Sequence, residues 1–180
     1  MSRRERRKVV AAEAVGPYTL LRVDRGGIDP GLPGQFFMLE APGRLLPRPM
    51  SLCLAPRGEL AFLIDPIGPG TRALCELEPG DGLTVFGPLG NGFRLDVRRP
   101  LLVGGGIGVA PFPHLSETLG RPPALLGFRR MLQPSSVASA AGQSMSRPLI
   151  LPGAMTSQSI DRVAWASSMN TTSRPSVDPK

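Results

Sequence analysis

The sequence is poor in the residues that hold metal ions. It has two cysteines, Cys53 and Cys75, and one histidine, His114, among 180 residues. An iron–sulfur cluster needs four cysteine ligands, or histidines in place of two of them, so this set cannot hold one. Each cysteine follows a leucine, which favours a buried thiol, and His114 lies beside Pro113 and Leu115 in a predicted helix, which favours a structural role. We therefore predict no metal site and no catalytic side chain.

Long apolar runs are also missing. No run reaches 18 residues, and the N-terminus passes from charge into Val9 and Val10 with too short an apolar stretch for a signal peptide. We expect a cytoplasmic protein with reduced thiols and no membrane partner.

More than half of the excess charge lies at the N-terminus. The net charge is +7, of which residues 1–8 carry +4, residues 9–130 carry +1 and residues 131–180 carry +2. A basic arm of this kind binds RNA or anionic lipid in some proteins, but it also forms solvated strands whose charges keep an edge from pairing, and we favour the strand. Aromatic residues make up only 5% of the chain, so we expect no nucleic-acid partner.

Glycine and proline are abundant, at 22 and 21 residues, and indicate many tight turns. Between these turns the pattern predicts strands over 18–24, 35–41, 50–55, 59–65 and 83–86, with a short helix over 71–77. Five or six short antiparallel strands in a stretch of this length predict a small closed barrel.

The pattern changes at Pro100. An apolar strand over 101–103, a glycine loop over 104–108, a helix over 109–119 and an apolar segment over 123–128 predict a βαβ unit, which begins a parallel sheet. A complete nucleotide-binding domain needs further strands, so we expect a truncated one. The predicted boundaries are 1–98 for the barrel, 99–130 for the βαβ unit and 131–180 for a tail.

The tail has eleven serines and no glutamate, phenylalanine, tyrosine or cysteine. It is either a natural, disordered extension or the product of a frameshift near Arg130. Of the two other reading frames, one has a forced TGA stop codon at Met155–Thr156, and the other stays open and allows a helical start. We favour the frameshift.

Three motifs are suited to phosphate. Arg48-Pro49-Met50-Ser51 offers a planar guanidinium to a pyrophosphate, and Gly68-Pro69-Gly70-Thr71 opens a short helix whose free N–H groups bind anions. Gly104 to Pro111 combines a strand, a glycine loop and a helix in that order. Its spacing is not that of the G-x-G-x-x-G fingerprint, which excludes a Rossmann assignment, and the first two motifs are weak alone.

As a set, and with Gly87 to Phe93 added, these motifs resemble the ferredoxin reductase-like flavoproteins. Within that family they look like the electron transfer subunits of NAD-linked dihydroorotate dehydrogenases, over residues 9–130. The resemblance implies a six-stranded antiparallel FAD-binding barrel followed by a parallel-sheet nucleotide-binding domain. It implies that FAD is held by Arg48, Pro49, Met50, Ser51, Leu63, Ile64, Asp65, Gly70 and Thr71, and that NAD faces Gly104, Gly105, Gly106, Ile107 and Gly108.

The resemblance further implies a partner, the FMN-containing dihydroorotate dehydrogenase catalytic subunit, in a heterotetramer. Electrons would pass from that FMN through a 2Fe-2S cluster to FAD and then to NAD, in pyrimidine biosynthesis. The family's cluster cysteines lie in a C-terminal segment, and this chain has no cysteine after Cys75. The alternative is a truncated remnant that binds FAD without electron transfer activity, so whether the chain acts as an oxidoreductase stays open here.

Overall fold

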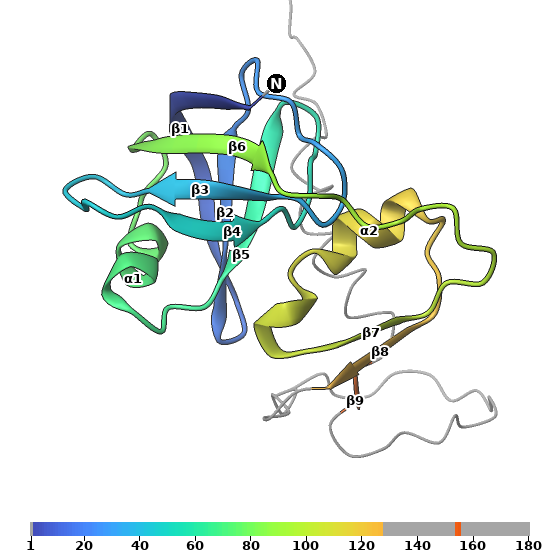
Figure 1. Cartoon of the computed structure of the whole chain (residues 1–180). Helices are drawn as coiled ribbons and strands as arrows, with labels where there is room; N and C mark the ends of the chain where they lie inside the picture. Colours follow the sequence, from blue (N-terminus) through green and yellow to red (C-terminus); the bar gives the residue numbers. More distant parts are fainter. Residues whose placement is uncertain (1, 128–153, 156–180) are drawn as a thin grey trace, which may run out of the picture.

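Six antiparallel strands form the first unit of the structure, a computed structural model that describes residues 2–127, 154 and 155. They lie in the sheet order β4-β3-β6-β1-β2-β5 (Figure 1). Their bounds are β1 Arg3–Val15, β2 Tyr18–Asp24, β3 Phe36–Glu40, β4 Arg48–Ser51, β5 Glu59–Ile64 and β6 Gly82–Leu89, and the short helix α1, Pro69–Cys75, lies between β5 and β6.

The sheet curls because its two edge strands are joined through the segment that follows β4. The N–H of Leu52 donates to the carbonyl of Gln35 at 3.2 Å, so this segment continues the pairing with the β3 side. On its other side, the segment pairs with Ala61 of β5. The N–H of Cys53 donates to the Ala61 carbonyl at 2.8 Å, and Leu54 forms an antiparallel bridge with the same residue. The sheet therefore closes into the barrel that the strand pattern predicts, and closure removes exposed edges.

Apolar side chains on the inward faces of the strands fill the barrel. In β3, Phe37 and Leu39 are fully buried, while their neighbours along the strand are only half-buried. Phe37 meets Phe62 of β5 edge to face, with ring centroids 5.7 Å apart, which is a favoured geometry for aromatic pairs. Strand periodicity located β2, β3, β5 and β6, whereas the strand expected over 50–55 is displaced, because β4 covers Arg48–Ser51.

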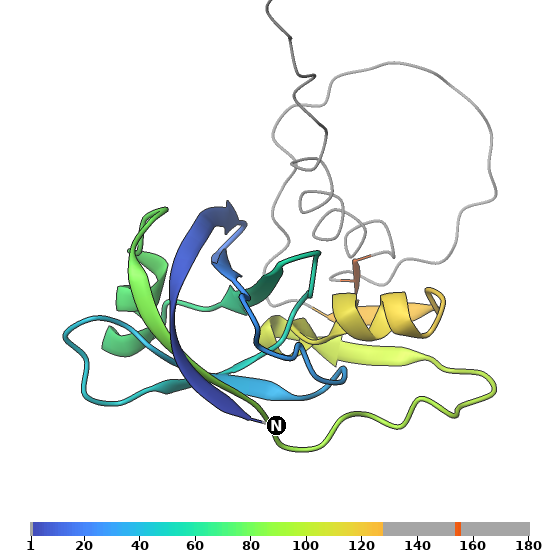
Figure 2. The same ribbon diagram turned by 90° about the horizontal axis from the view of Figure 1, so that it is seen from above.

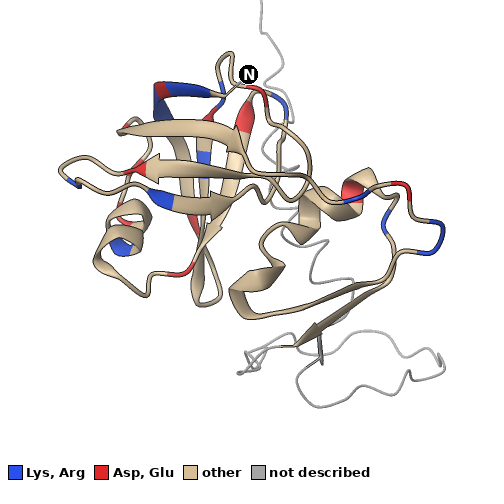
Figure 3. Ribbon diagram, viewed as in Figure 1, with Lys and Arg blue, Asp and Glu red and all other residues tan. Residues whose placement is uncertain are grey.

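The basic N-terminal arm is the first half of β1, as the charge pattern indicates. Residues 3–8 pair with β6, and pairing with β2 begins only at Val9. Figure 3 shows the basic residues of this arm along β1 near the N-terminus. Part of the charge is paired locally, since Arg4 bonds to Glu40 at 2.8 Å and Arg7 forms an ion pair with Glu5.

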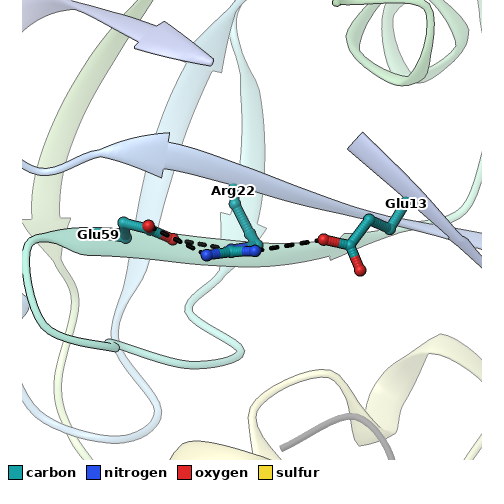
Figure 4. A network of polar contacts seen from close by, with 3 residues as sticks. All are labelled: Glu13, Arg22 and Glu59. Atoms are coloured by element: carbon teal, nitrogen blue, oxygen red, sulfur yellow. Dashed lines mark hydrogen bonds and ion pairs between the residues drawn. The ribbon is translucent and has the colours of Figure 1, made fainter. Parts of the chain in front are cut away.

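A buried ion-pair network ties three strands together (Figure 4). The Arg22 side chain in β2 is only 5% exposed, and its guanidinium donates to both carboxylate oxygens of Glu59 in β5, at 2.7 and 3.0 Å. It also donates to Glu13 of β1 at 3.2 Å. Hydrogen bonding to Glu59 is the largest cause of a raised pKa of Arg22. The network lies on the same strand surface as Leu20, outside the barrel core.

The second unit is a small sheet with a helix on one face (Figure 2). It comprises β7 Leu102–Gly105, the 3-10 helix η1 Gly106–Val109, α2 Phe112–Thr118, β8 Ala124–Gly127 and β9 Ala154–Met155. β7 and β8 are parallel, and β9 is antiparallel to β8. Phe112 and Leu115 of α2 pack on Leu102 and Leu126 of the sheet. The predicted fold class, a six-stranded antiparallel barrel followed by the start of a parallel sheet, is confirmed.

The glycine segment differs from its prediction in one respect. β7 continues through Gly104 and Gly105, and a 3-10 turn follows, so α2 begins at Phe112 and not at 109. Pro111 and Pro113 favour this later start, because proline is tolerated only in the first turn of a helix. The boundary at 98/99 stays a prediction, and most of the predicted tail, 131–153 and 156–180, lies outside the described residues. No helix in the described part is long and apolar enough to cross a membrane.

Candidate functional site

The structure brings Arg48 and Gly70 together from two different elements. Arg48 lies opposite Leu39 at the start of β4, and Gly70 is the second residue of α1. A Cβ atom on Gly70 would lie 3.0 Å from both Cζ and Nη2 of Arg48 and still closer to Nε. The guanidinium therefore rests on the Gly70 backbone, and only glycine leaves room for it there.

The pair lines an open cavity of about 280 Å³ at one end of the barrel. Figure 1 shows that α1 and the hairpin between β3 and β4 lie at this end. Arg48 is half-buried in its wall, and Arg44 of the hairpin adds a second positive charge. The remaining lining residues are Gly43, Leu45, Leu46 and Pro69. Two guanidinium groups in one concave surface suit an anionic ligand.

The start of α1 uses the Thr71 hydroxyl as its cap. This hydroxyl accepts a hydrogen bond from the Gly68 N–H at 3.0 Å and donates to the Gly68 carbonyl at 3.1 Å. The first intrahelical bond runs from the Arg72 N–H to the Gly68 carbonyl at 2.9 Å. The amides of Gly70 and Thr71 precede that bond, so helix geometry gives them no intrahelical acceptor. Thr71 offers a ligand its backbone amide, because its hydroxyl is occupied.

The other residues of the Arg48 motif have separate positions. Met50 packs against the barrel core, because it shares the inward face of β4 with Arg48. Pro49 is exposed and Ser51 is half-buried, and both alternate with Met50 along the strand. Of these four predicted residues, the structure brings only Arg48 to the wall of the cavity.

The end of β5 splits its predicted residues between two faces. Ile64 is fully buried in the barrel core, whereas Leu63 lies in a second buried cluster outside it. Asp65 follows the strand and is half-buried. Burial raises the pKa of Tyr18, and the negative charge of Asp65 raises it further, so Asp65 lies near that phenol. Of these three residues, Leu63 and Asp65 therefore lie outside the barrel core.

The five residues of the glycine segment divide into two groups. Gly104 and Gly105 are needed for packing: a Cβ on Gly104 would lie 2.8 Å from Phe112 Cζ, and one on Gly105 would lie 2.8 Å from the Gly127 carbonyl oxygen. Gly106 has φ of +56°, and neither Gly106 nor Gly108 would bring a Cβ within 4 Å of another group. Ile107 is 38% exposed between them. The 106–108 turn thus presents open backbone, the surface that a close-approaching ligand requires.

A single buried cluster joins the barrel to Ala110, which lies two residues after this turn. Leu63 of β5 and Ala110 share it with Leu20, Cys53, Leu54 and Ala61. The N–H of His114 in α2 donates to the Cys53 carbonyl at 2.9 Å. Burial lowers the pKa of His114, and its Nε2 atom is buried without a hydrogen-bond partner in the described part of the chain. Sequence patterns did not reveal this junction, because its residues are far apart in the chain.

The cysteines have the surroundings of packing residues. Cys53 is fully buried, and burial, with a further contribution from the charge of Glu117, raises the pKa of its thiol to about 12. Cys75 is half-buried at the end of α1, and burial is the main cause of its raised pKa. Within residues 2–127, 154 and 155, no group of three or more histidine, cysteine, aspartate or glutamate side chains is arranged to hold a metal ion.

Known proteins resemble the chain in both sequence and fold. Over 88 residues it is 40% identical to the dihydroorotate dehydrogenase B (NAD(+)), electron transfer subunit of Clostridium perfringens (strain 13 / Type A), a match covering 48% of this chain and 36% of that protein. The corresponding subunit of Geobacillus thermodenitrificans (strain NG80-2) is 45% identical over 96 residues, or 48% of this chain and 37% of that one. The matched part is thus less than two fifths of these relatives.

Among solved structures, the ferredoxin reductase in carbazole 1,9a-dioxygenase matches with a TM-score of 0.60 and 27% identity, over 71% of this chain and 42% of that one. No protein-family profile matches the chain. The resemblance that the motifs indicate, to electron transfer subunits within the ferredoxin reductase-like flavoproteins, is therefore confirmed.

Proposed function

We propose that the chain is the FAD-binding part of an electron transfer subunit, which passes electrons from a dihydroorotate dehydrogenase catalytic subunit through FAD to NAD. The observation that carries the proposal is the contact of Arg48 with Gly70 beside a cavity. A guanidinium fork next to free helix amides matches the pyrophosphate that distinguishes FAD from FMN. The two relatives described above are named as electron transfer subunits of dihydroorotate dehydrogenase B (NAD(+)), which supports the proposal.

Seven of the predicted residues have a role in this proposal, namely those whose surroundings leave them available to a ligand. Arg48 and the amides of Gly70 and Thr71 would bind the pyrophosphate, while Leu63 and Asp65 would lie along the flavin and its ribityl chain. Flavin, when bound, supplies both hydride and single-electron chemistry. NAD would approach the open backbone of Gly106 and Gly108. No protein acid is required for hydride transfer itself, which agrees with the lack of a catalytic side chain in the proposal.

The junction at Ala110 supports electron transfer between the two ligands. Leu63 belongs to the proposed flavin site, and Ala110 comes two residues after Gly108 at the proposed NAD site. Because the two residues share one buried cluster, the two sites are held next to each other. Exclusion of water by such a cluster also protects a reduced flavin.

A 2Fe-2S cluster does not fit the cysteines of this chain. Cys53 is 0% exposed, and Cys53 and Cys75 together supply only two of the four ligands. We assign no step to a cluster in this chain. The names of the relatives support a catalytic subunit as partner. That this subunit contains FMN, forms a heterotetramer with the chain and serves pyrimidine biosynthesis is part of the proposal through the family resemblance alone.

The proposal is tested by flavin binding to the 180-residue chain and its Arg48→Ala variant. The chain should bind FAD more tightly than FMN, and Arg48→Ala should weaken FAD binding by about 1.5–3 kcal/mol, the range for a charge-assisted hydrogen bond. Arg57→Ala is the matched control, because Arg57 is exposed in the turn before β5, away from the cavity. Fluorescence titration with each flavin measures both effects.

Equal affinity for FAD and FMN would refute the assignment of the pyrophosphate site. A second measurement follows the absorbance of the bound flavin after mixing with NADH in a stopped-flow instrument. Bleaching of the flavin would support electron exchange between FAD and NAD, measured in the direction from NADH to FAD. Tight FAD binding without bleaching would instead support the alternative, a remnant that binds FAD without electron transfer activity.

A further inference from the structure

The hairpin between β3 and β4 exposes two adjacent leucines beside the cavity. Leu45 is 96% exposed and Leu46 is 67% exposed, and both line the cavity together with Arg48 and Gly70. Single exposed leucines are common on protein surfaces. Two neighbouring leucines in the wall of a cavity that also holds two arginines form an apolar surface next to a cationic one.

The backbone holds these leucines in place. The N–H of Arg44 donates to the carbonyl of Ala41 at 3.2 Å, and Gly43 has φ of +71°. With Pro42 at the second position, these features match a type II turn, in which the third position requires positive φ. Pro47 restricts the other side of the leucine pair. A ligand that covers the leucines therefore has little loop entropy to overcome.

The size of the cavity limits what it accepts. Its volume of about 280 Å³ lies just below the roughly 300–1,000 Å³ typical of pockets that enclose a whole drug-sized ligand. It is suited to one end of a longer molecule, with a flat apolar group on the leucines and an anionic group at the arginines.

We infer, on the basis of the proposed function, that Leu45 and Leu46 form a platform for the adenine ring of FAD. The pyrophosphate then lies at Arg48 and the Gly70 amide, and the flavin extends away from the hairpin. Arg44, which also lines the cavity, would add a second positive charge near the phosphates. The hairpin thus determines selection for the dinucleotide, because FMN has no adenosine to cover the leucines.

The test compares FAD and FMN binding to the 180-residue chain and a Leu45→Ser/Leu46→Ser variant. Loss of about 55 Å² of apolar contact at 25 cal/mol per Å² corresponds to about a tenfold rise in the Kd for FAD. The Kd for FMN should stay within about twofold, as for ordinary surface substitutions. Leu101→Ser is the matched control, since Leu101 is 60% exposed and does not line this cavity. Leu45→Met/Leu46→Met keeps an apolar platform and should bind FAD as the parent chain does.

Two results would overturn the platform. An unchanged Kd for FAD in the serine variant would exclude contact with the leucines, and equal losses for FAD and FMN would show a general disturbance of the site. If Arg48→Ala still weakens FAD binding in either case, the proposed function stands and only the platform fails. If the parent chain shows no preference for FAD over FMN, both fail together.

Discussion

Substituting Gly70 by alanine should leave the stability of the fold unchanged or higher and should weaken the binding of FAD. Gly70 is buried in the first turn of α1, and the three atoms nearest to an added Cβ all belong to the Arg48 guanidinium. Because that group is the end of a flexible side chain, it moves away and the barrel stays intact. Alanine is a better helix former than glycine by up to about 1 kcal/mol, so the fold should keep or gain stability.

Ligand binding should change in the other direction. Displacement of Arg48 from the helix start would remove the charge-assisted bonds that we propose between Arg48 and the pyrophosphate, at a cost of about 1.5–3 kcal/mol. The Kd for FAD should therefore rise about 10- to 150-fold. A variant that is at least as stable as the parent and yet binds FAD poorly is hard to explain by misfolding.

The assay pairs urea unfolding with fluorescence titration of FAD for Gly70→Ala and for Gly68→Ala. Gly68 is the matched control: it lies two residues away, has φ of −130°, which alanine adopts, and an added Cβ would meet nothing within 4 Å. Parent-like FAD affinity in Gly70→Ala would refute the reasoning, because it would show that the position of Arg48 on Gly70 is irrelevant to the ligand. A comparable loss in Gly68→Ala would refute it too.

Two further predictions concern stability. Glu59→Gln should lower the free energy of unfolding by about 1.5–3 kcal/mol, because Glu59 accepts two hydrogen bonds from the buried Arg22. Glu13→Gln should lower it by less than about 1 kcal/mol, because the Glu13 side chain is 39% exposed. Urea titrations check the order, and a larger loss for Glu13→Gln contradicts it. Burial raises the pKa of Cys53 from 9.0 to about 12, so between these values the unfolded thiol ionises while the folded one stays protonated. Stability should therefore fall as pH rises through this window, by up to about 1.4 kcal/mol per pH unit. Cys53→Ala should show a shallower fall, and an identical pH dependence in both chains counts against this origin.

Local patterns predicted the barrel well and the site only in part. The strand expected over 18–24 coincides with β2, because its strand-forming residues and the turn residues that bound it are visible within a few positions. The contact of Arg48 with Gly70 depends on how α1 packs against the end of the barrel, which no short window contains. The leucines at 45 and 46 read as ordinary apolar residues, since their exposure follows from the turn at Gly43. A signal for the late start of α2 was present in Pro111 and Pro113.

The glycine segment shows why composition alone overestimates the number of residues that a binding loop offers to a ligand. Five residues, 104–108, were assigned one role, yet Gly104 and Gly105 are already explained by Phe112 and by the β8 backbone. Packing therefore leaves only the turn at 106–108 for a ligand. Two residues after that turn comes Ala110, which is buried in one cluster with Leu63 of the barrel. Glycines that let β7 approach its neighbours thus also fix the position of the open turn beside the barrel. An added methyl group at Gly105 should consequently shift the turn as well as the sheet, whereas one at Gly108 should affect only a ligand.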